Sequence, residues 1–188
     1  QIPQTHATPL SRSIFKFFAP GQQQIGLHWH HFNQPILPPI VDLEPAANTA
    51  DTNKVLVYLP FENQNKVLQW LQPLTQYQFY LYGPGLSKSQ LGHIQCSGPC
   101  VDEFKRDLHQ SNAVISNAGF ELVSEALQLQ KRILVKALQG QMEQQSNALA
   151  LTQLQLGQST TTLNTNVIKE WLASQPHTSK VQYANVAQ

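Results

Sequence analysis

From residue 54 onward, runs of apolar residues alternate with segments whose apolar residues recur at helical spacing. Strands are predicted at residues 54–59, 77–82, 92–95, 112–116 and 132–135, since continuous runs rich in β-branched and aromatic residues are typical of strands buried on both faces. Helices are predicted at residues 65–74, 102–109, 120–129, 143–154 and 166–173 and from residue 181 onward, with Asp102 as a cap. This alternation predicts an α/β fold, a Rossmann-like parallel sheet with helices on both faces and right-handed crossovers.

Residues 1–50 have a different texture, with little periodicity and seven of the twelve prolines. A strand is predicted at residues 25–32 and an extended segment at residues 35–40, because each proline restricts its own φ and the residue before it. The chain starts at Gln1, and we expect it to be a piece of a longer protein. We therefore divide it into residues 1–45, an interdomain segment or the tail of an N-terminal domain, and residues 46–188, one globular domain.

The first 45 residues carry an apolar load that local structure is not expected to bury. It comprises Phe15, Phe17, Phe18, Trp29, Phe32, Ile36 and Leu37. Contiguous apolar surface usually marks a contact with another domain or chain. These residues are expected to dock on an N-terminal domain or to pair two copies of the chain in a homodimer.

Composition excludes several classes of protein. The 188 residues suffice for one domain with a core, and the net charge of +1 with 12% charged residues does not favour nucleic acid as a partner. The apolar runs fall far short of the ~20 residues that a transmembrane helix needs, and no signal peptide pattern is present. We therefore expect a cytoplasmic protein whose two cysteines, Cys96 and Cys100, are reduced thiols.

Three histidines near Trp29 raise the question of a metal site. His28 and His30 share one face of the predicted strand, but no Asp, Glu or Cys precedes Asp42. Metal sites usually need such further ligands, so no metal is predicted. A histidine here could instead meet a phosphate or an acceptor hydroxyl at a domain cleft, which keeps His30 and His31 as candidates for a catalytic base.

The turn from the strand at residues 112–116 to the next helix is the most informative stretch. In open parallel sheets, ligands bind at the carboxyl ends of strands, where the next helix offers free N–H groups and the positive end of its dipole. The small residues Ala118 and Gly119 would let the backbone approach a diphosphate, and Glu125 could accept hydrogen bonds from two ribose hydroxyls. The alternative is an ordinary helix start with a solvated glutamate. Residues 60–63, after an earlier strand, either contact an acceptor or simply start a helix.

The residues that follow this turn extend the pattern. A strand is followed by Glu143-Gln144, then Asn147-Ala148, then Leu154-x-x-Gly157. Together with the turn and Glu125, this order resembles the donor signature of UDP-glycosyltransferases and MurG-type enzymes over residues 92–157. The resemblance implies the C-terminal, donor-binding half of a GT-B glycosyltransferase.

The resemblance also implies roles for individual residues. Asn117, Ala118, Gly119 and Phe120 would hold the diphosphate, Glu125 the ribose, and the segment with Gln141, Glu143 and Gln144 the donor sugar, while Cys100 and Val101 lie in the loop that reads the base. This chain departs from the family pattern at Ala118, Leu122 and Lys136, among other positions, which leaves the nucleotide and the sugar open.

The implied function is hexosyl transfer from a nucleotide-sugar, with a UDP-sugar favoured, to an unknown acceptor, without a cofactor. The acceptor site and the base would come from an N-terminal domain in the same polypeptide or in a separate subunit, so this chain alone is expected to be inactive. Two alternatives remain: an enzyme like the sugar-nucleotide 2-epimerases, and a non-catalytic nucleotide- or glycan-binding module. The module is favoured if Glu125 and Gln144 do not converge on one cleft.

Overall fold

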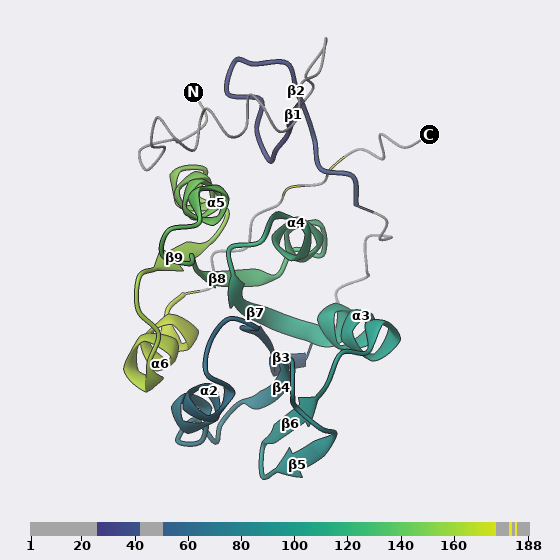
Figure 1. The fold of residues 1–188 in the computed structure, drawn as a ribbon, viewed down its shortest axis with the longest axis vertical. Coiled ribbons are helices and arrows are strands. Elements are labelled where there is room, and N and C mark those ends of the chain that lie inside the picture. Colours follow the sequence, from purple (N-terminus) through teal and green to yellow (C-terminus); the bar gives the residue numbers. More distant parts are fainter. Residues whose placement is uncertain (1–25, 42–50, 176–180, 182, 184–188) are drawn as a thin grey trace.

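A computed structural model describes residues 26–41, 51–175, 181 and 183. Its centre is a seven-stranded sheet of order β5-β6-β4-β3-β7-β8-β9 (Figure 1). The strands are β3 (Asp51–Tyr58), β4 (Gln78–Tyr82), β5 (Ser89–Leu91), β6 (Ile94–Ser97), β7 (Ser111–Asn117), β8 (Arg132–Lys136) and β9 (Gln158–Thr160). Every neighbouring pair is parallel except β5 with β6. The predicted parallel α/β sheet is therefore confirmed, with β5 and β9 as additional edge strands.

Helices cover both faces of the sheet, as the alternation predicted. On one face, α2 (Gln64–Leu71) and α6 (Thr165–Ala173) pack in a core cluster that includes Val55 and Val57 of β3. On the other face, α3 (Val101–Gln110), α4 (Phe120–Gln128) and α5 (Met142–Gln153) pack in a second cluster that includes Leu56 (Figure 1). The alternation of β3 side chains between the two clusters is the two-residue period of a strand. No helix among the described residues is long and apolar enough to cross a membrane.

The strand order creates a switch point beside β3. The chain runs from β3 outward through β4 to β6, and then α3 carries it back to β7 on the other side of β3. The loops that follow β3 and β7 therefore leave the sheet in opposite directions. Ligands of open α/β sheets bind in the crevice that this divergence leaves at the carboxyl edge.

The segment at residues 26–41 differs from its prediction. Its strands are only β1 (Gly26–Leu27) and β2 (Ile36–Leu37), which pair in parallel, and the strand predicted through residue 32 is wrong beyond Leu27. Phe32 and Asn33 have positive φ values of 47° and 58°, which turns the chain back. Trp29 leaves the strand to pack on α4, where its Nε1 donates to Ser124 Oγ at 2.9 Å.

Two further sequence predictions need comment. Asp102 was expected to cap α3, but the N-cap is Cys100, whose extended backbone starts the helix earlier and puts Asp102 in the first turn. A carboxylate in that position still favours the helix dipole. The helix predicted from residue 181 and most of the proposed segment at residues 1–45 lie outside the described residues. Within that segment, Trp29 is buried against this chain and Leu37 is 45% exposed.

Candidate functional site

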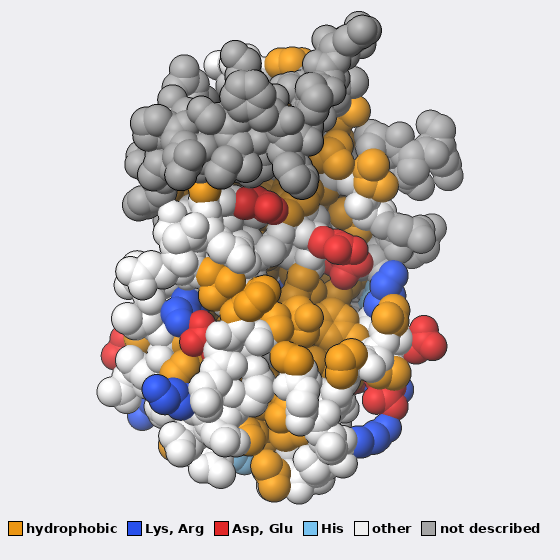
Figure 2. Space-filling model, in the orientation of Figure 1, with side chains coloured by type: hydrophobic (Ala, Val, Ile, Leu, Met, Phe, Trp, Pro, Cys, Tyr) orange, Lys and Arg blue, Asp and Glu red, His pale blue; other side chains and the backbone are white. Residues whose placement is uncertain are grey.

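A cavity of about 480 Å³ opens at the carboxyl edge of the sheet, between α3 and α4. Its walls come from the ends of β3 and β4, the loop before α3 and the first turns of α4. They comprise Tyr58, Pro60, Tyr82, Gly83, Pro84, Pro99, Cys100, Val101, Phe104, Lys105, Glu121, Leu122 and Glu125. Figure 2 shows hydrophobic side chains gathered in the middle of this face, with charged side chains around them. An apolar cavity with a few polar groups at its border is the usual form of a small-molecule site.

Aromatic rings form one wall of this cavity. The Phe104 ring meets the rings of Tyr58 and Tyr82 edge-on, at centroid distances of 5.4 and 5.0 Å. Aromatic walls of this kind offer large apolar contact to a flat ligand ring. Beside this wall, Val101 is 70% exposed at the start of α3.

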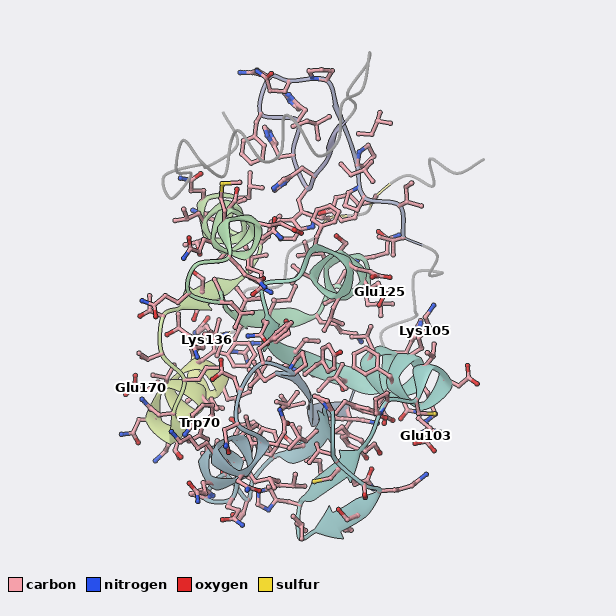
Figure 3. All side chains as sticks on the ribbon, viewed as in Figure 1. Trp70, Glu103, Lys105, Glu125, Lys136 and Glu170 are labelled. Atoms are coloured by element: carbon pink, nitrogen blue, oxygen red, sulfur yellow. The ribbon has the colours of Figure 1, made fainter. Side chains whose placement is uncertain are left out.

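Glu125 lies on α4 and faces the cavity, with Lys105 of α3 across from it (Figure 3). Burial raises the pKa of the Glu125 carboxyl, an effect that the charge of Lys105 partly opposes and that of Glu121 reinforces. A half-buried carboxylate beside an apolar wall is a strong acceptor for hydroxyl groups. Glu125, which was predicted to bind the ribose, therefore lines the same cavity as Cys100 and Val101, which were predicted to read the base.

Beneath the aromatic wall, a buried polar network joins β3, β4 and α3. The Tyr82 hydroxyl donates to Asp107 Oδ2 at 2.5 Å, and Lys54 Nζ donates to Asp107 Oδ1 at 3.1 Å and to Gln110 Oε1 at 2.8 Å. Burial raises the pKa of Tyr82, and the hydrogen bond to Asp107 raises it further, so Tyr82 stays a neutral donor. Sequence analysis missed this network, for which a lysine at the start of a buried strand was the only signal.

The Ala118–Gly119 turn connects β7 to α4. Gly119 is the N-cap of α4, and no side chain of the described residues caps the helix. Beyond its chain neighbours, no described heavy atom lies within 4 Å of where a Gly119 Cβ would be. The space beside the Gly119 Cα is therefore open, and a helix N-terminus without a side-chain cap suits an anion.

Side-chain amides hold this turn in place from both sides. Asn147 of α5 donates to the carbonyl of Ala118 at 3.0 Å, and Asn117 Nδ2 donates to the carbonyl of Lys136 at 3.1 Å. Asn147 was noted only as part of a sequence signature, and the structure gives it the physical role of fixing the backbone next to Gly119.

At the start of α5, Gln144 is buried and its Oε1 accepts a hydrogen bond from the Leu138 N–H at 3.1 Å. Gln144 thereby braces the loop between β8 and α5, whereas Gln141 and Glu143 are exposed. Glu125 lines the cavity between α3 and α4, but Gly119 and Gln144 lie outside its lining. The sugar-binding role of this segment stays a prediction.

The three histidines lie in the segment at residues 26–41, which packs on the start of α4 through His28 and Trp29. His28 is buried beside Phe120, and burial together with the nearby His30 lowers its pKa to about 4. His30 and His31 are exposed and stack on each other with ring centroids 4.4 Å apart. Across the described ranges, no three His, Cys, Asp or Glu side chains are grouped to hold a metal ion, and Cys96 and Cys100 are free thiols.

An ion pair that sequence analysis also missed joins two loops of the carboxyl edge. Lys136 Nζ, at the end of β8, donates to Glu62 Oε1 at 2.5 Å, in the loop after β3. In Figure 3, Lys136 lies on the side of the molecule toward β9 and α6, and Glu125 lies on the opposite side, beside α4. Residues 60–63 therefore do not only start α2, since Glu62 also ties the loop after β3 to the end of β8.

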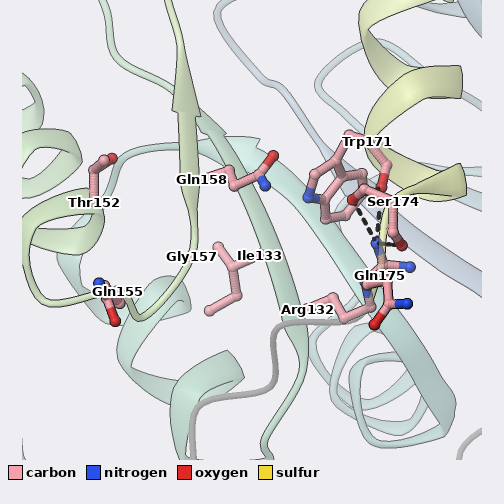
Figure 4. Close-up of a pocket in the computed structure, with 9 residues that line it drawn as sticks. All are labelled: Arg132, Ile133, Thr152, Gln155, Gly157, Gln158, Trp171, Ser174 and Gln175. Carbon is pink, nitrogen blue, oxygen red and sulfur yellow. Dashed lines mark hydrogen bonds between the residues drawn. The ribbon is translucent and has the colours of Figure 1, made fainter.

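A second cavity, of about 410 Å³, lies around the amino end of β8 (Figure 4). Arg132 borders it, and its guanidinium donates to the carbonyls of Trp171, Leu172 and Ser174. These bonds add donors to carbonyls at the carboxyl end of α6, where the Trp171 carbonyl also accepts from the Ser174 N–H. We therefore assign Arg132 a role in folding.

Comparison with known proteins gives a family and a fold. The family described as "Glycosyl transferase family 1" matches residues 13–176. Similar solved structures include the spinosyn forosaminyltransferase SpnP, with a TM-score of 0.58 and 11% identity over 92% of this chain and 54% of that one. The glycotransferase of kitacinnamycin follows at 0.55 and 13%, over 73% and 39%. The calicheamicin glycosyltransferase CalG4 gives 0.51 and 13%, over 74% and 38%.

This chain spans about half or less of the length of each of these structures. At such identities the likeness concerns the fold, which is the GT-B type that the resemblance implied. None of the curated proteins compared with the chain matches it.

Proposed function

Because the chain belongs to glycosyl transferase family 1, we propose that it is the donor-binding domain of a glycosyltransferase that uses a nucleotide-sugar, with a UDP-sugar expected. The observation that carries the proposal is the cavity at the carboxyl edge. It brings Glu125 of α4 together with Cys100 and Val101, which are more than twenty residues away in the sequence. The family signature assigned these residues to one nucleoside, and the cavity supports that grouping.

In the proposed complex, the base lies against Phe104 and the backbone at Val101, and the ribose hydroxyls donate to Glu125. The diphosphate lies over Gly119, where the uncapped N-terminus of α4 provides N–H groups and a favourable dipole. The sugar then extends toward Glu143 and Gln144 at the start of α5. The open space above Gly119 supports this path.

The acceptor and the catalytic base are proposed to come from another domain, in the same polypeptide or in a second subunit. Phe61 is 61% exposed in the loop after β3, at the same edge as the cavity. Exposed apolar side chains beside a ligand site fit a surface that a second domain covers. This chain by itself is then expected to bind the donor without transferring its sugar.

Calorimetry with UDP, GDP, dTDP and uridine tests the proposal. We expect at least one nucleoside diphosphate to bind, and Glu125→Ala to weaken its binding by about 1–3 kcal/mol, the scale of a hydrogen bond to a charged group. Glu170→Ala is the matched control, because Glu170 is exposed on α6, over the other face of the sheet. The proposal fails if none of the nucleotides binds, or if both variants bind like the wild type.

One observation favours a second candidate, a non-catalytic nucleotide- or glycan-binding module. Gln144 lies outside the cavity that Glu125 lines, and its oxygen is already bound to the backbone. A module would bind UDP and a UDP-sugar alike, whereas a donor domain gains contacts from the sugar. A 2-epimerase-like enzyme would instead convert the donor sugar, which NMR of the donor detects. Turnover by this chain alone would reopen the search for a base among His28, His30 and His31.

A further inference from the structure

The guanidinium of Arg132 is buried at the edge of the sheet opposite the proposed donor site. Arg132 begins β8, and Lys136 ends it at the carboxyl edge, about 13 Å away for a strand of this length. By the two-residue period of a strand, the Arg132 side chain shares the face of Leu134, which packs in one core cluster with Trp171 and Leu172 of α6. Arg132 therefore lies against the carboxyl end of α6, at the amino edge of the sheet.

The bonds to α6 do not use all the donors of Arg132. Its Nη1 donates to the Leu172 carbonyl at 3.2 Å, and its Nη2 donates to the carbonyls of Trp171 at 2.7 Å and Ser174 at 3.1 Å. A guanidinium has five N–H donors. Within the described residues, Nε donates to no acceptor and Nη1 to a single one. Nε and the second hydrogen of Nη1 are therefore available to another acceptor.

The positive charge of Arg132 is also incompletely balanced. Arg132 is 7% exposed, and none of the ion pairs among the described residues includes it. Burial lowers its pKa, and the group that opposes this effect is the phenol of Tyr77, not a carboxylate. The carboxyl end of α6 contributes only about half a negative charge through the helix dipole. Because a buried charge is costly unless it is paired, the site lacks part of its counter-charge.

This incompletely paired guanidinium borders the cavity of about 410 Å³ at the amino edge (Figure 4). The cavity lies between the starts of β8 and β9 and the last turns of α5 and α6, and Arg132 is the one charged residue of its lining. Three glutamines of the lining, Gln155, Gln158 and Gln175, offer amide N–H groups, and Trp171 offers an aromatic ring. In Figure 4 the Gln158 side chain extends from β9 toward Trp171. A cation and amide donors around a cavity of this size suit a small ligand with anionic oxygens.

We infer that this cavity is a second ligand site, which binds the carboxylate or phosphate group of a small molecule through Arg132 and the surrounding glutamine amides. The inference does not depend on the proposed function, because the cavity lies at the other edge of the sheet. Arg132 keeps its bonds to α6 and donates to the ligand with the N–H groups that remain. The ligand supplies the missing negative charge, and its apolar part lies against Trp171.

NMR titration of the isotope-labelled chain with sodium citrate and with inorganic phosphate tests the inference, at an ionic strength kept constant with sodium chloride. We expect at least one of them to shift the Arg132 Nε–H and Trp171 indole N–H signals in a saturable way. A response to citrate alone identifies a carboxylate site, a response to phosphate alone a phosphate site, and a response to both a site for either group. Glycerol, which is neutral, should shift neither signal.

A variant that blocks the cavity locates the binding without touching Arg132. Gln158 is exposed on the edge strand β9, so Gln158→Trp fills the cavity and leaves the bonds from Arg132 to α6 in place. It should weaken binding of citrate or phosphate at least about 10-fold, as for a lost charged hydrogen bond. Gln90→Trp, at an exposed position of the other edge strand β5, is the matched control and should bind like wild type. Neither variant should change the binding of a nucleoside diphosphate at the carboxyl edge.

Two results would overturn the inference. If neither anion shifts the two signals of the wild-type chain, Arg132 serves only to hold the end of α6. If an anion binds but Gln158→Trp binds it as tightly as wild type, the anion lies elsewhere, for example at the start of α4. The titration of wild type needs no variant, so the first result is decisive even if a substitution disturbs the fold.

Discussion

Replacing either charge of the Lys54–Asp107 pair should destabilise the fold by different amounts. The two side chains are 7% and 5% exposed, so each charge depends on the other and on a few polar neighbours. Asp107→Asn leaves the Lys54 ammonium with Gln110 as its remaining charge-compensating oxygen and with the face of the Tyr80 ring. Lys54→Met leaves the Asp107 carboxylate with the Tyr82 hydroxyl and Arg106.

The neighbours that remain decide the expected size of each effect. Removing one partner of a buried ion pair typically costs about 3–5 kcal/mol, because a charge is left buried and uncompensated. We expect Asp107→Asn to fall in that range. Lys54→Met should cost less, about 1–3 kcal/mol, because two donors still face the carboxylate. The double variant leaves no buried charge and should be about 1–3 kcal/mol more stable than the sum of the single effects predicts.

Urea unfolding of the four proteins, followed by tryptophan fluorescence and circular dichroism, measures this cycle. Coincident transitions and similar m-values are needed to compare free energies of unfolding. Lys169→Met is the control, because Lys169 is exposed on α6, apart from this pair. Additive single effects, or a larger cost for Lys54→Met than for Asp107→Asn, would refute the reasoning.

Two further predictions concern the start of α5 and the histidine segment. Gln144→Glu keeps an acceptor for the Leu138 N–H but removes the amide donor. It should therefore weaken the binding of a UDP-sugar and leave the binding of UDP unchanged. Gln144→Ala should in addition lower the free energy of unfolding by about 1–3 kcal/mol, because the Leu138 N–H loses its acceptor. Equal loss of both ligands in Gln144→Glu would contradict a sugar contact. The pKa of His28 is about 4 in the folded chain and 6.5 unfolded, with His30 nearby. Since the unfolded state binds the proton first, stability should be full above pH 6.5 and fall by up to about 3 kcal/mol as the pH drops toward 4. His28→Phe should remove that part of the pH dependence in urea unfolding at several pH values; an unchanged slope would show that His28 does not cause it.

The sheet could be predicted where burial leaves a mark on the sequence. Residues 54–59 and 112–116 are apolar on both faces because helices cover both sides of β3 and β7, and such runs stand out from their flanks. The edge strands β5 and β9 consist mostly of exposed Ser, Gln and Thr. Only the neighbouring strand makes these residues extended, so their sequence carries no signal. The strand predicted at residues 25–32 failed for a related reason, since its apolar residues are buried by α4 and not by a sheet.

In the candidate site, too, features that depend on nearby residues could be predicted, and contacts between distant parts of the sequence could not. Glu125 could be predicted because its place depends on helical spacing from a turn that is local in the sequence. The pairs Lys54–Asp107 and Glu62–Lys136 join residues 53 and 74 positions apart. Which loops meet across β7 depends on the order of the strands, and that order cannot be read from the alternation of elements alone. The bond from Gln144 to Leu138 is local, but a glutamine at a helix start fits many roles, and only the loop conformation selects this one.

The spacing of the proposed ligand groups along the sheet edge argues for an extended ligand. The cavity with Glu125 opens by the ends of β4 and β3, Gly119 follows β7, and Gln144 lies in α5, which follows β8. These are successive strands, so the groups are spread over about three strand spacings, roughly 14 Å. A single ring in the cavity would not extend to the uncapped start of α4. A nucleoside, two phosphates and a sugar in a row would meet an acidic group first, then helix N–H groups, and then the amide of Gln144. That order of chemistry along the edge is the reason to expect that uridine and UDP depend on Glu125, and only the nucleotide-sugar on Gln144.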